Sequence, residues 1–125
     1  MGYRVLIVDD SSVMRKIVRR NLRQTGIQVD REFEAEDGYE ALEVLAGNNV
    51  DIVLCDVNMP NLDGISFVKQ VRKKTELNDV KIVMITSEAG FDIVNNAISA
   101  GANGYIIKPF TADHLLEKIE TAIEE

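Results

Sequence analysis

Short runs of consecutive apolar residues alternate along the chain with segments whose apolar positions recur every three or four residues. The runs are typical of strands buried on both faces, and the periodic segments are typical of helices that bury one face. The expected strands cover residues 3–8, 27–35, 52–55, 81–85 and 105–107. The second differs from the others, because apolar and polar residues alternate from Ile27 to Ala35, which predicts an edge strand with one solvated face.

The periodic segments begin at residues that can cap a helix, and three of them end at Gly26, Gly47 and Gly101. The expected starts are Ser11 or Ser12, Asp37 with Gly38, Asp63 or Gly64, and Thr111; residues 75–79 form a polar linker. The side chains expected to face the core are Val13, Met14, Ile17, Val18 and Leu22; Ala41, Leu42, Leu45 and Ala46; Ile65, Val68 and Val71; Val94, Ala97 and Ile98; and Leu115, Ile119, Ala122 and Ile123.

Five strands alternating with five helices predict a parallel sheet, because each helix then serves as a right-handed crossover. The expected fold class is therefore α/β, a doubly wound five-stranded parallel sheet with five helices. With the polar second strand at an edge, the flavodoxin-like order 2-1-3-4-5 is the natural choice, and its topological switch point lies between strands one and three. At 125 residues the chain is expected to form one domain, residues 1–125.

Composition and charge narrow the function. A hydrophobic content of 46% without an apolar run of ~20 residues predicts a soluble protein, and a single cysteine fits a reducing cytoplasm. The first ten residues have neither a signal peptide nor a myristoylation pattern. A net charge of -7 argues against nucleic-acid binding, and the basic residues between 15 and 23 are interpreted as the solvated face of a helix. We expect a cytoplasmic monomer that contacts neither nucleic acid nor membrane.

Polar side chains follow four of the five expected strands: Asp9 and Asp10, Asp56, Thr86, and Lys108. Each has an ordinary explanation when taken alone, since an aspartate after a strand can begin a turn, Thr86 can be a strand-end hydroxyl and Lys108 a surface lysine. The carboxyl ends of parallel strands open onto one rim, however, and packing does not require these residue types there. Together they indicate a functional site.

Phosphoryl chemistry suits this set of side chains. Three adjacent carboxylates raise one another's pKa values unless a cation lies among them, and Mg²⁺ prefers such oxygen ligands. The metal and Lys108 would neutralise phosphoryl oxygens while a carboxylate attacks phosphorus. Asp56 is the best nucleophile, Asp9 and Asp10 are better seen as metal holders, and Thr86 is expected within reach of a phosphoryl oxygen.

Four stretches of the chain, VDDSS, CDVNMPNLDG, MITSEA and GYIIKPF, resemble the receiver domain of two-component response regulators. The resemblance covers essentially all 125 residues and is strongest to single-domain, CheY-like chemotaxis regulators. It implies that Asp56 is the phosphoacceptor. It also implies that Asp10, Asp56 and the backbone carbonyl of Asn58 hold Mg²⁺, with Asp9 helping through water. Lys108 would bind the phosphoryl group, and its bond to Pro109 would be cis.

The resemblance further implies a signalling role. Thr86 would move toward the phosphoryl group and Tyr105 would rotate inward, which re-shapes a face built from the fourth helix, the fifth strand and the fifth helix; from the residues alone, Tyr105 could equally be a half-buried strand aromatic. The implied partners are a CheA-like histidine kinase as phosphodonor, a downstream target such as a flagellar motor switch protein, and possibly a phosphatase. The protein would not be an enzyme beyond its own phosphorylation and self-dephosphorylation.

Some residues match the family and others depart from it. Asn58 and Glu88 match the chemotaxis pattern at positions that tune dephosphorylation, which favours a short-lived phosphoryl state. Ser87 stands where the family usually has Ala or Gly, so it is expected to narrow access and alter donor preference. Residues 27–34 look about two residues longer than in enteric chemotaxis regulators, which leaves the register of the second strand open.

Other reactive residue types are interpreted as structural. Cys55 lies inside an apolar strand and is expected to be an inert core thiol. His114 is alone on the last helix without a second ligand, so a surface role is expected. The methionines Met14, Met59 and Met84 fall at core or loop positions and define no cofactor site.

Two other classes of protein are alternatives to a binding module. An aspartyl-phosphate phosphatase also uses an aspartate after a strand, but it carries a second acid two residues on, where this chain has Asn58. A flavodoxin would need a phosphate-binding loop after the first strand, where Asp9 and Asp10 would repel a flavin phosphate. The last helix runs to Glu125, which favours a stand-alone regulator over a receiver domain of a longer protein and leaves both open.

Overall fold

Strand and helix alternate throughout residues 2–125, the part of the chain that the computed structural model describes. The strands are Tyr3–Val8 (β1), Val29–Ala35 (β2), Ile52–Cys55 (β3), Lys81–Thr86 (β4) and Gly104–Ile107 (β5). The helices are Ser12–Gln24 (α1), Gly38–Gly47 (α2), Gly64–Arg72 (α3), Phe91–Ala100 (α4) and Ala112–Glu124 (α5). A short 3-10 helix, Thr75–Leu77 (η1), interrupts the segment that was expected to be polar linker. None of the helices in residues 2–125 has the length and apolar character needed to cross a membrane.

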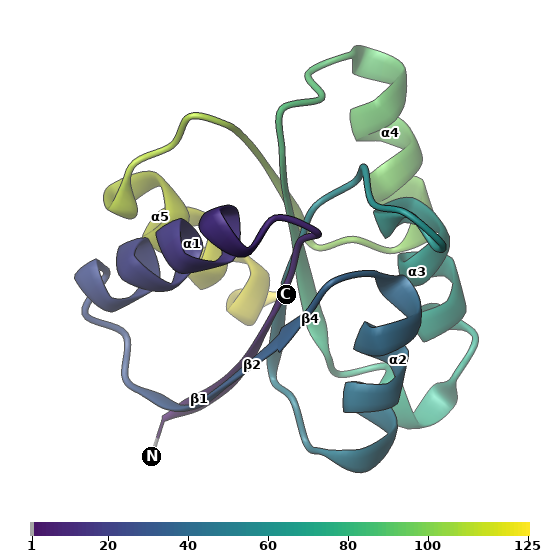
Figure 1. Cartoon of the computed structure of the whole chain (residues 1–125), viewed down its shortest axis with the longest axis horizontal. Coiled ribbons are helices and arrows are strands. Elements are labelled where there is room, and N and C mark those ends of the chain that lie inside the picture. The colour runs from purple at the N-terminus through teal and green to yellow at the C-terminus, as the bar shows by residue number, and fades with distance from the viewer. Residues whose placement is uncertain (1) are drawn as a thin grey trace.

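The strands pair in parallel in the order β2-β1-β3-β4-β5 across the described residues, which confirms the predicted topology. Helices α1 and α5 cover one face of the sheet, and α2, α3 and α4 cover the other (Figure 1). This order makes β1 and β3 direct neighbours, with the switch point between them. The polar residues that follow these two strands are thereby brought to the same edge of the sheet.

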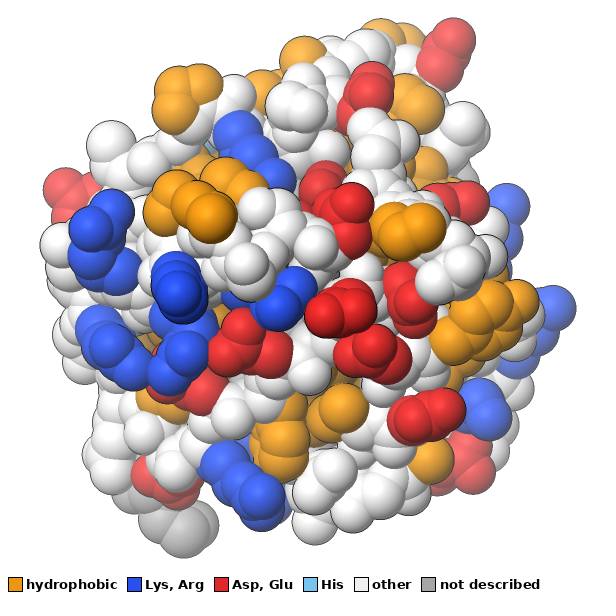
Figure 2. Space-filling model, viewed as in Figure 1, with side chains coloured by type: hydrophobic (Ala, Val, Ile, Leu, Met, Phe, Trp, Pro, Cys, Tyr) orange, Lys and Arg blue, Asp and Glu red, His pale blue; other side chains and the backbone are white. Residues whose placement is uncertain are grey.

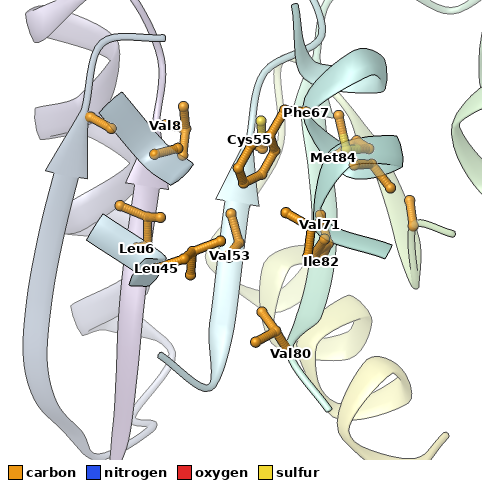
Figure 3. Close-up of a cluster of buried hydrophobic side chains, with 14 of the residues drawn as sticks. Leu6, Val8, Leu45, Val53, Cys55, Phe67, Val71, Val80, Ile82 and Met84 are labelled. Carbon is orange, nitrogen blue, oxygen red and sulfur yellow. The ribbon is translucent and has the colours of Figure 1, made fainter. Parts of the chain in front are cut away.

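The hydrophobic core lies in two layers, one on each face of the sheet, because alternate residues of a strand point to opposite faces. In β1, for example, Leu6 and Val8 belong to the layer beneath α2 and α3, whereas Val5 and Ile7 belong to the layer beneath α1 and α5. Phe67 of α3 is fully buried in the first layer. Figure 3 shows its ring close to the side chains of β3 and β4. The strands that are followed by the polar residues of the site are thus held in place by apolar packing on both faces of the sheet.

Several helix faces differ from the prediction. Val13 is 64% exposed and Ile98 is 47% exposed, although both were expected to face the core; Ala46 is also exposed. These residues lie at the margin of the apolar stripe, where the sheet no longer covers the helix. Phe67 was not among the side chains expected to face the core, yet it is fully buried. The buried positions of α3 are Gly64, Phe67, Val68 and Val71, and Ile65 is partly buried against the same cluster.

The edge strand β2 begins at Val29 rather than Ile27, and its exposure does not alternate cleanly. Tyr3 pairs with Val29 but Arg4 pairs with Arg31, so one residue, Asp30, is extra at the start of the ladder. A β-bulge of this kind absorbs an added residue without shifting the remaining pairs. The bulge settles the register of β2 that the sequence left open, while the predicted edge position is confirmed.

Candidate functional site

The sheet's hydrogen bonding continues past the strand ends and fixes the backbone of the site residues. The Asp56 N–H donates to the Val8 carbonyl at 2.9 Å, and the Lys108 N–H donates to the Thr86 carbonyl at 2.8 Å. Each site residue therefore leaves the sheet from a defined position rather than from a free loop. The Lys108–Pro109 bond is cis, as the resemblance implied.

Three carboxylates meet at the switch point. Ligand atoms of Asp9, Asp10 and Asp56 lie within 4.8 Å of one another, with Asp9 and Asp56 buried and Asp10 exposed. Figure 2 shows acidic side chains gathered near the centre of the molecular surface in this view, beside the Lys and Arg side chains that lie over α1. The predicted convergence of the acids from β1 and β3 is confirmed. Closely spaced hard oxygen donors with one side open to water suit Mg²⁺, which keeps several water ligands.

Lys108 faces two of the three acids. Its Nζ atom lies 3.2 Å from Asp9 Oδ2 and 3.7 Å from Asp56 Oδ2, and its side chain is only 17% exposed. The alternative that Lys108 is an ordinary surface lysine is therefore excluded. A positive charge in this position can pair with a phosphoryl group carried by Asp56.

The environment of Asp56 raises the pKa of its carboxyl above 3.8. Burial is the largest cause; a hydrogen bond with the Thr86 side chain, the charge of Lys108 and the Val57 N–H act in the opposite direction, while the charge of Asp9 adds to the increase. Thr86 is fully buried, so its hydroxyl is directed to the site rather than to solvent. The net result is a carboxylate that is costly to keep ionised unless a cation binds beside it.

This raised pKa predicts that neutralising Asp56 stabilises the metal-free protein. A carboxyl whose pKa is higher in the folded state favours folding below the unfolded value and loses that contribution as the pH rises through the folded value. At neutral pH, Asp56→Asn should therefore have a higher free energy of unfolding than wild type in the presence of a chelator, and the difference should shrink as the pH falls toward 3.8. Urea unfolding across this range measures it. Equal stabilities at neutral pH would contradict the account.

The loop after β3 returns to the phosphoacceptor candidate at Gly64. The Gly64 N–H donates to the Val57 carbonyl at 2.8 Å, and Asp56 Oδ1 accepts from the Val57 N–H at 2.7 Å. A Cβ atom on Gly64 would overlap the carbonyl oxygen of Asp56 and lie 2.9 Å from Met84 Cε. The close approach of α3 to the end of β3 thus requires a glycine at this position.

We expect Gly64→Ala to displace the end of β3, to lower stability by about 1–3 kcal/mol and to reduce phosphorylation of Asp56. Denaturant unfolding and phosphorylation by a small phosphodonor measure the two effects. Gly47→Ala is the matched control, because a Cβ there meets nothing within 4 Å. It should keep both properties, and equal losses in the two variants would refute the steric explanation.

One hydrogen bond joins the loop after β3 to the β4–α4 loop, and a second ties that loop back to Thr86. Asn58 Nδ2 donates to Glu88 Oε1 at 2.8 Å, and the Glu88 N–H donates to Thr86 Oγ1 at 3.3 Å. The Asn58–Glu88 pair therefore bridges the rim of the acid site, where both residues were expected to tune dephosphorylation. Ser87, the other tuning candidate, is exposed in the same loop.

Tyr105 is half-buried on β5, and its hydroxyl donates to the Glu88 carbonyl at 2.7 Å. Burial, together with the charges of Glu88 and Asp56, raises the pKa of its phenol. The Tyr105 hydroxyl thus contacts the β4–α4 loop two residues after Thr86, which is where a switch residue would have to lie. Its rotation on activation stays a prediction.

Residues that were interpreted as structural lie away from the acid cluster or are closed to solvent. Cys55 is fully buried, and burial raises the pKa of its thiol well above 9.0, which fits an inert core position. The backbone N–H of His114 donates to Thr111 Oγ1 in the cap of α5, and the residue is partly exposed on that helix.

One residue at the site was missed. Arg15 was assigned to the solvated face of α1, but its Nη1 atom donates to the Asp9 backbone carbonyl at 2.7 Å. The periodicity of the helix does place Arg15 outside the apolar stripe. Its contact with Asp9 could not be predicted from the sequence pattern, because it arises only where α1 passes the end of β1 in the folded protein.

Comparison with known proteins agrees with this arrangement. The pattern of the response regulator receiver domain matches residues 5–120. Chemotaxis protein CheY-3 of Vibrio cholerae is 44% identical over 121 residues, which cover 97% of this chain and 92% of that protein. The structure of Vibrio cholerae chemotaxis protein CheY4 superposes with a TM-score of 0.85 at 34% identity, covering 98% and 99% of the two chains.

A structure of a CheX-CheY-BeF₃-Mg²⁺ complex from Borrelia burgdorferi contains a chain with a TM-score of 0.82 at 27% identity, covering 95% of this chain and 87% of that one. Fold, site and similarity together define a receiver domain, and the chain belongs to the response regulator receiver domain family. Within that family it is similar to the CheY proteins of chemotaxis. A role in phosphorylation-activated two-component signalling follows from this membership.

Proposed function

We propose that this protein accepts a phosphoryl group on Asp56 from a CheA-like histidine kinase and then binds a downstream target in chemotaxis. Asp9, Asp10, Asp56 and the backbone carbonyl of Asn58 would hold Mg²⁺. The observation that carries the proposal is the meeting of three carboxylates within 4.8 Å with an ammonium group 3.7 Å from Asp56. The similarity to CheY proteins supports the choice of pathway.

Each residue of the site would have a separate role in phosphoryl transfer. A carboxylate oxygen of Asp56 attacks phosphorus, the bond from phosphorus to the donor histidine breaks, and the imidazole leaves with the electron pair. When bound by these carboxylates, Mg²⁺ would supply positive charge for the phosphoryl oxygens. Lys108 is placed to pair with one of these oxygens and Thr86 to hydrogen-bond another. The chemistry is confined to the protein's own aspartate, so we infer no enzymatic activity on other substrates.

Release of the phosphoryl group would also take place at this rim. The Asn58–Glu88 hydrogen bond links the loop that follows Asp56 to the loop that follows Thr86, and exposed Ser87 is the neighbour of Glu88. These side chains are placed to regulate how water or a phosphatase reaches the phosphoryl group. In the Borrelia burgdorferi complex the partner of CheY is CheX.

The signal is proposed to leave through α4, β5 and α5. A phosphoryl group adds about -1.5 to -2 charges at Asp56, which favours movement of Thr86 toward it and inward rotation of Tyr105. The nearby surface carries exposed apolar side chains, Phe91 at 79% and Ile98 at 47% on α4 and Ile107 at 41% on β5. Such side chains suit a protein partner. Phosphorylation would act by favouring the binding-competent arrangement of this face.

Beryllofluoride activation tests the proposed output. Wild-type protein with Mg²⁺ and beryllofluoride should retain a flagellar motor switch protein in a pull-down, and the untreated protein should retain much less. Asp56→Asn treated in the same way is the control and should behave as the untreated protein. Binding that is independent of beryllofluoride, or that persists in Asp56→Asn, would contradict the proposal.

A further inference from the structure

Arg15 links the acid site to the edge of the sheet. It lies in the first turns of α1, where its N–H donates to the Ser11 carbonyl at 3.0 Å. Its guanidinium donates from Nη1 to the Asp9 carbonyl at 2.7 Å and from Nε to Glu34 Oε1 at 2.8 Å. The side chain is only 12% exposed. The planar guanidinium therefore spans β2 and the loop between β1 and α1.

The contact with the Asp9 carbonyl acts on Asp10. A peptide unit is planar, so its carbonyl oxygen, the next nitrogen and the next Cα atom move together. By holding the Asp9 oxygen, Arg15 fixes the plane from which the Asp10 side chain departs. Glu34 limits rotation of the guanidinium, because its carboxylate accepts a hydrogen bond from Arg15 Nε.

Asp9 and Asp10 differ in how many hydrogen bonds orient their carboxylates. Asp9 Oδ1 accepts from the Ser11 N–H at 2.9 Å, and Asp9 Oδ2 accepts from Lys108 Nζ at 3.2 Å. The Asp10 carboxylate is exposed, and within residues 2–125 it accepts no hydrogen bond that would orient it. Its position relative to Asp9 and Asp56 therefore depends on the backbone that Arg15 holds.

We propose that Arg15 is a positioning residue for the cation site, and that it holds the Asp9–Asp10 peptide so that Asp10 faces the other two carboxylates. The inference rests on the proposed function, because it takes the three acids to bind Mg²⁺. Groups that hydrogen-bond to metal ligands and orient them typically contribute about 10–100-fold to metal affinity, and we expect the low end of that range for Arg15, which acts through the Asp9–Asp10 peptide.

The charge of Arg15 and its positioning role predict opposite changes in Mg²⁺ affinity when Arg15 is removed. Arg15 is a cation close to a cation site, so its removal should strengthen Mg²⁺ binding if only Coulomb interaction matters. Its removal should weaken Mg²⁺ binding if the orientation of Asp10 matters more. The sign of the change in affinity separates the two roles.

Arg19 offers a matched control on the same helix. Its Nη1 atom pairs with Glu34 Oε2 at 3.0 Å and its Nε atom lies 3.6 Å from Glu32 Oε1, so it shares a partner with Arg15. In the part of the chain described here its guanidinium makes no hydrogen bond to the loop between β1 and α1. Loss of Arg19 removes a similar charge and ion pair but leaves the Asp9 carbonyl contact in place.

The experiment is a Mg²⁺ titration of the unphosphorylated protein, followed by amide NMR shifts, for wild type, Arg15→Ala, Arg15→Lys, Glu34→Gln and Arg19→Ala. We expect Arg15→Ala to bind Mg²⁺ about tenfold more weakly than wild type. Arg15→Lys keeps the positive charge and Glu34→Gln keeps the guanidinium, but each weakens the contacts that hold the Asp9 carbonyl. Their Mg²⁺ affinities should lie between those of wild type and Arg15→Ala, and the affinity of Arg19→Ala should match that of wild type. The metal-free amide shift of Asp10 should change in Arg15→Ala and not in Arg19→Ala.

Each outcome decides the question. Mg²⁺ binding by Arg15→Ala that equals or exceeds that of wild type overturns the inference, as does an equal loss in Arg19→Ala. Should Arg15→Ala fail to fold, as judged by its amide spectrum, Arg15→Lys decides instead, because it keeps the positive charge and loses the guanidinium: unweakened Mg²⁺ binding overturns the inference and weakened binding supports it. Failure of wild type itself to bind Mg²⁺ would instead refute the proposed metal site.

Discussion

Replacing Asp56 with asparagine is expected to abolish phosphorylation while preserving the fold. An amide has nearly the shape of a carboxylate and can still accept the Val57 N–H, which lies 2.7 Å from Oδ1. It lacks the anionic oxygen that attacks phosphorus and removes one of the three grouped carboxylates. Incubation with acetyl phosphate and Mg²⁺, followed by intact-mass measurement, should detect one added phosphoryl group in wild type and none in the variant.

Asp51→Asn is the matched control for this experiment. Asp51 precedes β3 at the opposite edge of the sheet, where it accepts from the Arg4 N–H at 2.9 Å. The same chemical change there should leave phosphorylation at the wild-type level. Labelling of Asp56→Asn at that level, or its loss in both variants, would refute the assignment of the phosphoacceptor.

Replacing Phe67 with alanine should cause a large loss of stability. Its side chain is fully buried between α3 and the sheet, in the same cluster as Cys55 and Met84 (Figure 3). A phenylalanine-to-alanine change in such a position costs about 3–5 kcal/mol, because burial is lost and a cavity remains. Urea unfolding at neutral pH measures the difference from wild type.

Phe91→Ala is the control for this prediction, since Phe91 is 79% exposed on α4. Its free energy of unfolding should stay within roughly 0.5 kcal/mol of wild type. The contrast between the two phenylalanines tests the core directly. Similar losses in both variants would show that the assigned burial is wrong.

Much of the fold could be predicted because the strong signals are local. The apolar runs of β3 and β4 are too short for helices and end at polar residues, so their place in a parallel sheet followed from alternation with helices. The site followed from the same logic, since parallel strands end at one rim. Asp9 and Lys108 lie 99 positions apart in sequence, yet their side chains lie 3.2 Å apart.

The features that escaped prediction depend on tertiary contacts. Phe67 and Ile65 are both apolar and two positions apart, so periodicity alone could not choose between them; only the way α3 lies on the sheet leaves Phe67 fully buried and Ile65 partly buried. The bulge at Asp30 reflects the pairing of β2 with β1, which residues 27–35 do not encode by themselves. Arg15 follows the pattern of a solvated position, and only the passage of α1 over the end of β1 brings it to the Asp9 carbonyl.

The central claim is that acids from β1 and β3 form one cation-dependent phosphoryl-acceptor site. Its most direct measurement is mass-spectrometric mapping of the modified residue in wild-type protein treated with acetyl phosphate, in Mg²⁺ and in a chelator. We predict modification of Asp56 alone, and only when Mg²⁺ is present. Modification of another residue, or equal modification of Asp56 in the chelator, would contradict the account.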